Sequence, residues 1–192
     1  MQQNRIIMKR IISILFALII VATMSYQLEA QTFGAPEIMK GKIVVGGNAN
    51  LGLSGRCFYV GVAPQAGYRL TRSLETGVRL GYDLDYYWEY YGNYFYHHIS
   101  GAVYANYEIY SGLYLQVEDE EMCLLVRGTD LGNLTPEWYN SVFVGGGYRQ
   151  YFSETSFAYY SIMYNLSWDY SFNGGSPYAS PFVIRVGFCK GL

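Results

Sequence analysis

The second of two adjacent histidines, His98, is followed two residues later by Ser100. Alternate residues of a strand share one face, so a strand here would place an imidazole beside a hydroxyl, the arrangement of a base and a serine nucleophile. An orienting acid is missing, because Glu108 lies about 33 Å from His98 along an extended strand. Only a loop acid such as Glu89 or Glu121 could orient the histidine. We therefore predict a polar residue pair and no enzyme activity.

Two groups of acidic residues could do chemistry. The run from Glu118 to Glu121 has the ligands for a divalent cation that bridges surface sugars or phosphates, but a solvated strand end explains the run at least as well. Asp83 and Asp85 alternate, and we interpret them as part of a structural ion network, because nothing suggests the sugar cleft of a glycosidase. No residue spacing matches a metal site. The sequence predicts no metal and no cofactor.

The most unusual segment runs from Tyr86 to Tyr96 and reads YYWEYYGNYFY. Tyr and Trp give large rigid contacts, and Gly and Asn add adaptable hydrogen bonds, a composition typical of recognition loops. The alternative is an aromatic girdle at a membrane surface, which explains the ends of the segment better than its middle. The residues that we assign to a surface recognition loop are Tyr87, Trp88, Tyr90, Tyr91, Tyr94 and Tyr96.

The composition indicates what kind of scaffold positions these side chains. Of 192 residues, 51% are hydrophobic and only 15% are charged, which is too few charges to cover a soluble surface. The chain has 22 tyrosines against 10 phenylalanines and 3 tryptophans, and tyrosine suits a boundary between apolar and aqueous surroundings. A formal net charge of -2 gives no electrostatic reason to bind nucleic acid. We expect one domain that is partly covered by something other than water.

Residues 1–30 have the pattern of a cleavable signal peptide. A basic start that includes Lys9 and Arg10 precedes an uncharged apolar run from Ile11 to Met24, and Ala30 is a small residue suited to cleavage. The run is shorter than the roughly 20 residues of a transmembrane helix, and an uncleaved N-terminal anchor is the alternative. Export would place Cys57, Cys123 and Cys189 in an oxidising compartment. A Cys57–Cys123 bridge stays open, but we favour three unpaired thiols.

From Gly41 onward, apolar and polar residues alternate with a period of two. The clearest example runs from Leu74 to Tyr86, where Val78 and Leu80 share one face and Arg79 lies on the other. This alternation is longer than the mean soluble strand of roughly 5–6 residues and covers the roughly 9–11 of a tilted membrane strand. Similar patterns predict eight strands, at residues 42–53, 57–69, 74–86, 98–109, from 113, around 142–148, 160–170 and 182–188. Beyond residue 30 no stretch is a helical span, so only a closed barrel remains for a membrane protein.

The predicted links alternate in length, except that the first outer link, at 54–56, is short. Three are short and lie at 71–72, 110–112 and 153–154, whereas the links at 87–96, 121–137 and 171–177 are longer and polar or aromatic. Short turns on one side and long loops on the other are typical of outer-membrane barrels. We therefore assign residues 31–40 to a periplasmic lead-in and residues 41–190 to an all-β, eight-stranded antiparallel transmembrane β-barrel.

The charged side chains fall on the face opposite the apolar stripe. An arginine turned to lipid at mid-membrane would cost about 2–4 kcal/mol, so this face must line a lumen only wide enough for its own side chains. We predict that the charges neutralise one another there, and that inward glycines such as Gly67 and Gly77 make room for long arginines or ease strand curvature. The predicted lumen ion network consists of Arg69, Glu75, Arg79, Asp83, Asp85, Glu108, Arg149, Asp169 and Arg185, with Glu118 on the same face.

The signal segment, the Leu74–Tyr86 alternation, the Gly-Tyr-Arg turn entries at 67–69 and 147–149 and the terminal strand from Ser180 to Phe188 carry a resemblance. Together they resemble small outer-membrane β-barrel proteins of the OmpX and OmpA transmembrane-domain type, especially short versions from Bacteroides-like bacteria. The resemblance implies periplasmic termini, assembly by the barrel insertion machinery, and roles in adhesion, envelope integrity or defence. His98 and Ser100 also resemble the catalytic pair of lipid A deacylase barrels.

These observations predict a non-enzymatic barrel in the outer membrane of a Gram-negative bacterium, with a structural or surface-recognition role. A narrow solute or ion pore is the alternative, and a lipid A-modifying hydrolase is a third. The expected partners are outer-membrane lipid, lipopolysaccharide, the insertion machinery, and an extracellular protein or glycan at the outer loops.

Overall fold

The computed structural model describes residues 41–192 apart from 55–56, 90–91, 128–135, 170–176 and 179. The two-residue alternation produces strands along these residues. They are β1 (Ile43–Ser54), β2 (Cys57–Arg69), β3 (Leu74–Glu89), β4 (Gly92–Tyr110), β5 (Leu113–Arg127), β6 (Pro136–Tyr151), β7 (Ser156–Asn165) and β8 (Phe182–Gly191). The signal peptide and lead-in predicted for residues 1–40 lie outside the described residues.

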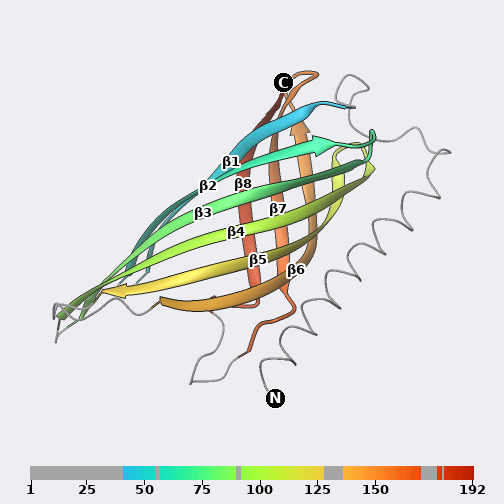
Figure 1. Ribbon diagram of the computed structural model, residues 1–192. Coiled ribbons are helices and arrows are strands. Elements are labelled where there is room, and N and C mark those ends of the chain that lie inside the picture. The colour runs from blue at the N-terminus through green and yellow to red at the C-terminus, as the bar shows by residue number, and fades with distance from the viewer. Residues whose placement is uncertain (1–40, 55–56, 90–91, 128–135, 170–176, 179) are drawn as a thin grey trace, which may run out of the picture. The chain divides into compact units, whose positions relative to one another are not determined.

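The strands form one antiparallel sheet that closes on itself in chain order, β1 to β8 (Figure 1). The predicted eight-stranded antiparallel barrel is therefore confirmed. Following paired residues around the barrel from Ile43, and continuing the β1–β8 register, returns to β1 near Leu53. A stagger of this size in eight strands corresponds to a strand tilt of about 40°.

Inward and outward residues alternate as the sequence predicts. Leu80 is 64% exposed and its neighbour Arg79 only 4%, while Ile184 is 70% exposed and Arg185 only 6%. In β7, buried positions alternate with exposed ones from Tyr159 to Asn165. The exterior is thus mainly apolar and most of the charged side chains lie in the interior; Asp119 and Glu121 of β5 are exceptions on the outer face. Such a surface suits hydrocarbon, where a charge on the outer face would be costly.

The three links that were predicted to be short connect β2 to β3, β4 to β5 and β6 to β7. They lie at one end of the barrel, which we call the turn end. At the opposite end the links after β1 and β3 are also short, with two residues each. The β4–β5 turn has Ser111 and Gly112 at positive φ, of 35° and 91°. A Cβ atom on Gly112 would lie 2.3 Å from the backbone oxygen of Arg149, so this position requires glycine.

The opposite end, the loop end, differs from the prediction. The expected loop at 87–96 is mostly strand, because β3 and β4 pair as far as Glu89 and Gly92. β5 likewise continues to Arg127, inside the predicted link at 121–137, and β7 ends at Asn165 instead of Tyr170. Aromatic residues favour strands, and directly opposed aromatic pairs such as Tyr86 and Phe95 stabilise this extension.

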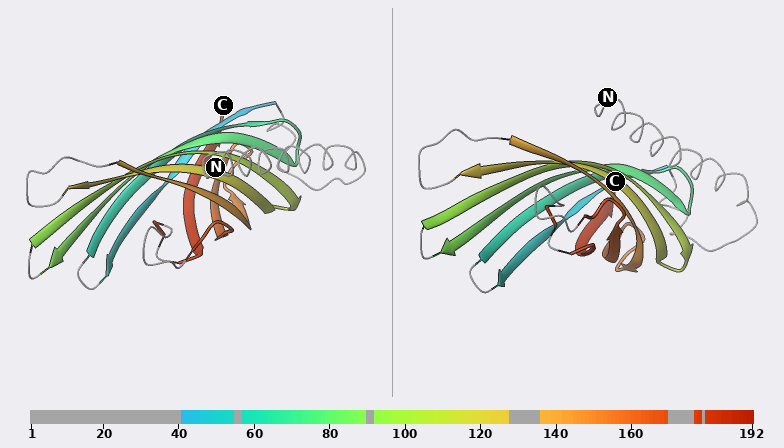
Figure 2. Two further views of the ribbon diagram at one scale, coloured as in Figure 1. Left: turned by 60° about the horizontal axis from the view of Figure 1, so that its bottom comes forward. Right: turned by 90° about the horizontal axis from the view of Figure 1, so that it is seen from below.

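The wall of the barrel is consequently uneven. β3 to β6 have 16, 19, 15 and 16 residues, whereas β7 and β8 have 10 each. Figures 1 and 2 show the long strands sweeping past the ends of β7 and β8. Part of the sheet therefore projects beyond the closed section at the loop end.

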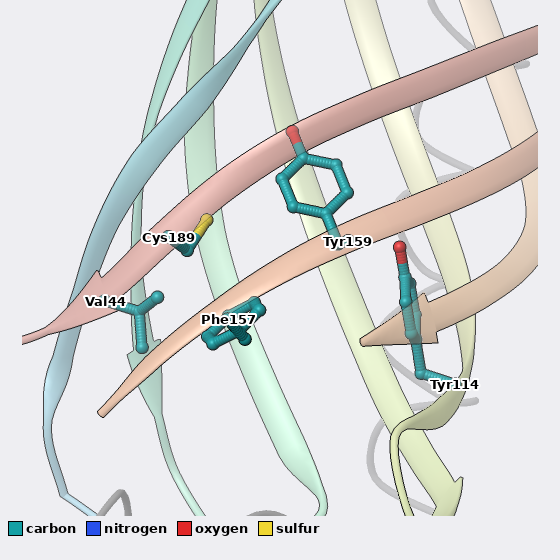
Figure 3. Packing of buried hydrophobic residues seen from close by; sticks show 5 residues of the cluster. All are labelled: Val44, Tyr114, Phe157, Tyr159 and Cys189. Atoms are coloured by element: carbon teal, nitrogen blue, oxygen red, sulfur yellow. The ribbon is translucent and has the colours of Figure 1, made fainter. Parts of the chain in front are cut away.

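An apolar cluster fills the turn end of the lumen (Figure 3). It consists of Val44, Tyr114, Phe157, Tyr159 and Cys189, with Tyr151 packed against it.

Among the described residues, no helix has the length and hydropathy to cross a membrane.

Candidate functional site

Four strands bring four predicted lumen residues together near the turn end. We call Arg69, Glu75, Glu108 and Arg149 the turn-side cluster. The Arg69 side chain lies 3.4 Å from both Glu75 and Glu108, and Arg149 lies 3.1 Å from Glu75 and 3.7 Å from Glu108. All four side chains are at most 2% exposed. Two cations and two anions thus neutralise each other without water.

Neighbouring groups fix the geometry of this cluster. The Tyr151 hydroxyl donates to Glu108 at 2.8 Å and accepts from Arg69 at 3.1 Å. The backbone N–H of Gly112 also donates to Glu108, at 2.9 Å. The Arg149 guanidinium lies over the rings of Tyr114 and Phe157, 4.8 and 5.0 Å from their centroids. These contacts join the ion pairs to the apolar cluster, so both parts close the same end of the barrel.

A second group occupies the middle of the lumen. We call Arg79, Glu118, Glu120 and Arg185 the mid-barrel cluster. Arg185 donates to both oxygens of Glu118, at 2.8 and 2.9 Å. Arg79 pairs with the same carboxylate and lies 3.3 Å from Glu120. Bidentate arginine–carboxylate pairs of this kind are strong and directional.

Glu120 was not predicted as a lumen residue. It was considered only within the acidic run, although it has the same parity as Glu118 and that signal could have identified it. Glu118 and Glu120 are buried inside, whereas Asp119 and Glu121 are half-buried on the outer face. The Asn140 amide donates to Asp119 at 2.8 Å and to Glu121 at 3.3 Å. The run therefore divides between the two faces.

The remaining predicted lumen residues lie apart from both clusters. Asp85 lies 3.4 Å from His98 near the loop end. Asp83 pairs opposite His98 in the backbone register, and its carboxylate occupies the space beside Gly61. Asp169 was expected on the inner face of the seventh strand, but it follows the end of β7 and is exposed.

The contact between His98 and Asp85 corrects the expectation that only a loop acid could orient this histidine. Asp85 lies two residues from the position opposite His98, so neighbouring strands provide an acid that spacing along one strand cannot reveal. Ser100 is buried two residues further on the same face. No hydrogen bond between His98 and Ser100 occurs in the described part of the chain, and no group of three or more His, Cys, Asp or Glu residues there could hold a metal.

The inward glycines make room mainly for residues other than arginine. A Cβ atom on Gly67 or on Gly77 would lie 2.6 Å from the Tyr104 hydroxyl, and one on Gly187 would lie 2.5 Å from the Tyr159 ring. Gly145 leaves space for Met163 in the same way. Gly61 and Gly81 face the side chains of Asp83 and Ser100. The predicted role in accommodating arginines is therefore wrong, because the side chains nearest to these glycines are not arginines.

Little space remains between the two clusters. A cavity with room for about one water molecule lies there. Its lining includes Arg79 and Arg185 from the mid-barrel cluster, Arg149 from the turn-side cluster, and Asn106. Two atoms of these lining residues, Arg149 Nε and Asn106 Oδ1, are buried without a hydrogen-bond partner. The lumen of the described barrel is thus a packed polar core with a small gap between its charged layers.

The aromatic segment forms a row of rings on the outer face of β3 and β4. We call Tyr82, Tyr86, Trp88, Phe95 and His97 the aromatic ridge. Tyr86 lies 4.8 Å from Phe95 and 6.0 Å from Trp88 between ring centroids. The Tyr82 hydroxyl lies 2.9 Å from His97 Nδ1.

Only part of the predicted recognition loop contributes to this ridge. Trp88 lies on it, whereas Tyr96 has inward parity and is half-buried. Tyr87 and Tyr94 are opposed in the register, and Tyr90 and Tyr91 lie outside the described residues. Sequence reasoning missed Tyr82, Tyr86 and Phe95 as ridge members, although their two-residue spacing along extended strands was the available signal.

The structure tests part of the prediction that the three cysteines are unpaired. Cys123 and Cys189 are buried free thiols. The Cys57 side chain lies outside the described residues. A Cys57–Cys123 bridge is therefore not present in this structure.

No family model matches the sequence, and no curated protein matches it. Among solved structures, the match to the N-terminal β-barrel domain of Pseudomonas aeruginosa OprF covers 80% of this chain and 98% of that chain, with 13% identity and a TM-score of 0.45. The match to Neisserial surface protein A (NspA) covers 80% and 98%, with 12% identity and a TM-score of 0.47. A de novo designed transmembrane β-barrel matches over 80% and 97%, with 15% identity and a TM-score of 0.38. The barrel architecture of this chain is therefore established by the pairing of its own strands.

Proposed function

We propose that this chain is an outer-membrane β-barrel protein with a structural or surface-recognition role and a lumen closed to solutes. The observation that carries the proposal is the filling of the lumen by the turn-side and mid-barrel clusters. A permeating ion would have to separate ion pairs that are buried away from bulk water. Breaking one such pair is strongly unfavourable. The interior therefore acts as a core that stabilises the wall.

The exterior supports a membrane location. Exposed large apolar side chains line the outer face of β2, β3 and β8, for example Val62 at 52%, Leu80 at 64% and Ile184 at 70%. A contiguous apolar surface of this kind would associate in water, whereas outer-membrane lipid and lipopolysaccharide would cover it. The first strand begins and the last strand ends at the turn end, where Val44 of β1 pairs with Gly191 of β8. We place that end in the periplasm, where the barrel insertion machinery acts.

The aromatic ridge supports a recognition role at the loop end. Trp88 and Phe95 are 36% and 41% exposed, and the two strands that carry them extend beyond β7 and β8. Rings held by strand pairing are rigid, so they lose little conformational entropy on binding. The partners that fit such a surface are an extracellular protein or a glycan.

Conductance in a planar lipid bilayer tests the closed lumen. The purified full-length protein should insert and show no steady current, because both charged layers obstruct the path. A steady ionic current through single molecules would contradict the proposal and favour a narrow pore instead. Glu118→Gln, which weakens the mid-barrel cluster, provides a comparison in which transient currents should appear first.

Binding to immobilised glycans and extracellular-matrix proteins tests the recognition role. The protein in lipid nanodiscs is compared with a variant that carries Tyr86→Ser, Trp88→Ser and Phe95→Ser. Binding should be lost in the ridge variant and kept in a control with Phe152→Ser, which changes an exposed ring at the turn end. Equal binding by all three proteins, or no binding by any, would contradict a recognition surface at the ridge.

A further inference from the structure

The ladder between β1 and β8 closes only part of the barrel wall. Its pairs run from Val44–Gly191 to Asn48–Gly187. By contrast, β1 pairs with β2 as far as Ser54, and β8 pairs with β7 as far as Phe182. Within the described strands, residues 49–54 of β1 and 182–186 of β8 thus have a partner on one side only. Figure 1 shows β1 and β8 diverging from the end where they meet.

Contacts on either side of this seam bind each of the two strands to its other neighbour. Arg185 is tied to Glu118 by two hydrogen bonds across the lumen, and the rings of Tyr164 and Phe182 pack edge to face at 5.2 Å. These contacts keep β8 with β7 and the lumen. β1 instead follows β2 along its full length. Along the open part of the seam, each strand is thus anchored on the side away from the other.

The open part of the seam faces an apolar environment. On the outer face of β8, Phe182, Ile184 and Val186 are 60%, 70% and 50% exposed. The backbone N–H and C=O groups between them have no water to bind if lipid covers this face. Each unsatisfied group in hydrocarbon costs several kcal/mol, so the two edges need a partner that supplies backbone hydrogen bonds.

We propose that this open seam is an interface with a second copy of the same chain. β1 and β8 run in opposite directions, and their free stretches lie on the same half of the wall. Rotation about a two-fold axis along the membrane normal leaves the direction in which each strand crosses the membrane unchanged. It brings β1 of each copy beside β8 of the other. Both edges of both copies then pair antiparallel, in a self-complementary interface. The inference rests on the membrane location proposed above.

Cysteine cross-linking between two different variants tests the interface. In a background with Cys57, Cys123 and Cys189 changed to Ser, Leu51→Cys and Ile184→Cys are placed on separate, differently tagged copies that are expressed together. Leu51 and Ile184 would be opposite each other if the β1–β8 register continued. Mild oxidation should convert monomer into a heterodimer that carries both tags, and neither variant alone should dimerise efficiently.

Two controls separate this interface from chance contact and from misfolding. Val78 is 51% exposed on the outer face of β3, away from the seam. Val78→Cys expressed with Ile184→Cys should therefore leave monomer. Ile162→Cys and Ile184→Cys in one chain are opposed within the β7–β8 ladder and should form an internal bond. Monomer in the mixed Leu51 and Ile184 experiment would overturn the proposal, as would an internal bond when both changes are on one chain. A heat-dependent shift in gel mobility shows separately whether the barrel has formed.

Discussion

At the scale of single residues, the two lumen clusters together balance four arginines against four glutamates. Each of the two clusters holds two of each kind. Because every charge is paired and at most 7% exposed, the loss of one partner leaves its counterpart in a medium that cannot solvate it. Removing both partners is expected to be less harmful.

Glu118→Gln should therefore destabilise the barrel by about 3–5 kcal/mol, because Arg79 and Arg185 both lose their shared carboxylate. The measurement is the free energy of unfolding in urea with detergent micelles. Adding Arg185→Gln should restore part of the loss. The outward change Glu121→Gln is the matched control and should have little effect. A single-variant loss no larger than that of the control would contradict the role of the mid-barrel cluster.

Gly77→Ala and Gly101→Ala make the same change in neighbouring strands, but we expect only Gly77→Ala to reduce the stability of the barrel. A Cβ atom at Gly77 would lie 2.4 Å from the backbone oxygen of Ala66 and 2.6 Å from the Tyr104 hydroxyl. At Gly101 the nearest atom would be Leu80 Cδ2, at 3.9 Å. Gly77→Ala should cost roughly 1–3 kcal/mol and Gly101→Ala close to nothing, as measured by the temperature at which the folded gel band disappears. Equal temperatures would refute the packing role of Gly77.

At the scale of elements, the middle of each strand was predictable and the loop end was not. Alternation over Leu74–Tyr86 is decided by local chemistry, since one face must avoid lipid. The segment after Tyr86 has aromatic residues at both odd and even positions, so no two-residue alternation marks it as a strand. An aromatic girdle, a loop and a strand were therefore all compatible with its sequence. Its pairing depends on β4, which lies across the hairpin. The partner of His98 was missed for the same reason, because Asp85 is adjacent only through the strand register.

Arginine substitutions on the outer face should show a dependence on position along the strand. Leu80→Arg would place a charge in the apolar band and should cost about 2–4 kcal/mol, whereas Trp138→Arg, near the loop end of β6, should cost at most about 1 kcal/mol. The free energy of unfolding in lipid vesicles provides the comparison. A cost at Trp138 equal to that at Leu80 would show that the apolar band extends over the projecting part of the wall.

At the scale of the whole molecule, two kinds of surface define the protein. The outer face is mainly apolar around the closed section, with Asp119 and Glu121 as its exceptions on β5, and the inner face is filled by ion pairs and large side chains. The long strands β3 to β6 add a projecting wall that carries the aromatic ridge. The exterior supports residence in a membrane, the filled lumen supports closure, and the ridge supports recognition at the loop end.

The most direct test of this arrangement is the environment of spin labels along β7 in lipid vesicles. Labels at Tyr160, Ile162 and Tyr164 should collide with oxygen dissolved in the bilayer, and a label at the inward Ser161 should be shielded from both oxygen and a water-soluble nickel reagent. Ser161 is only 2% exposed, while Ile162 is 59% exposed. Access of the nickel reagent to Ile162, or an oxygen profile without a two-residue period, would contradict a lipid-facing exterior around a closed ionic core.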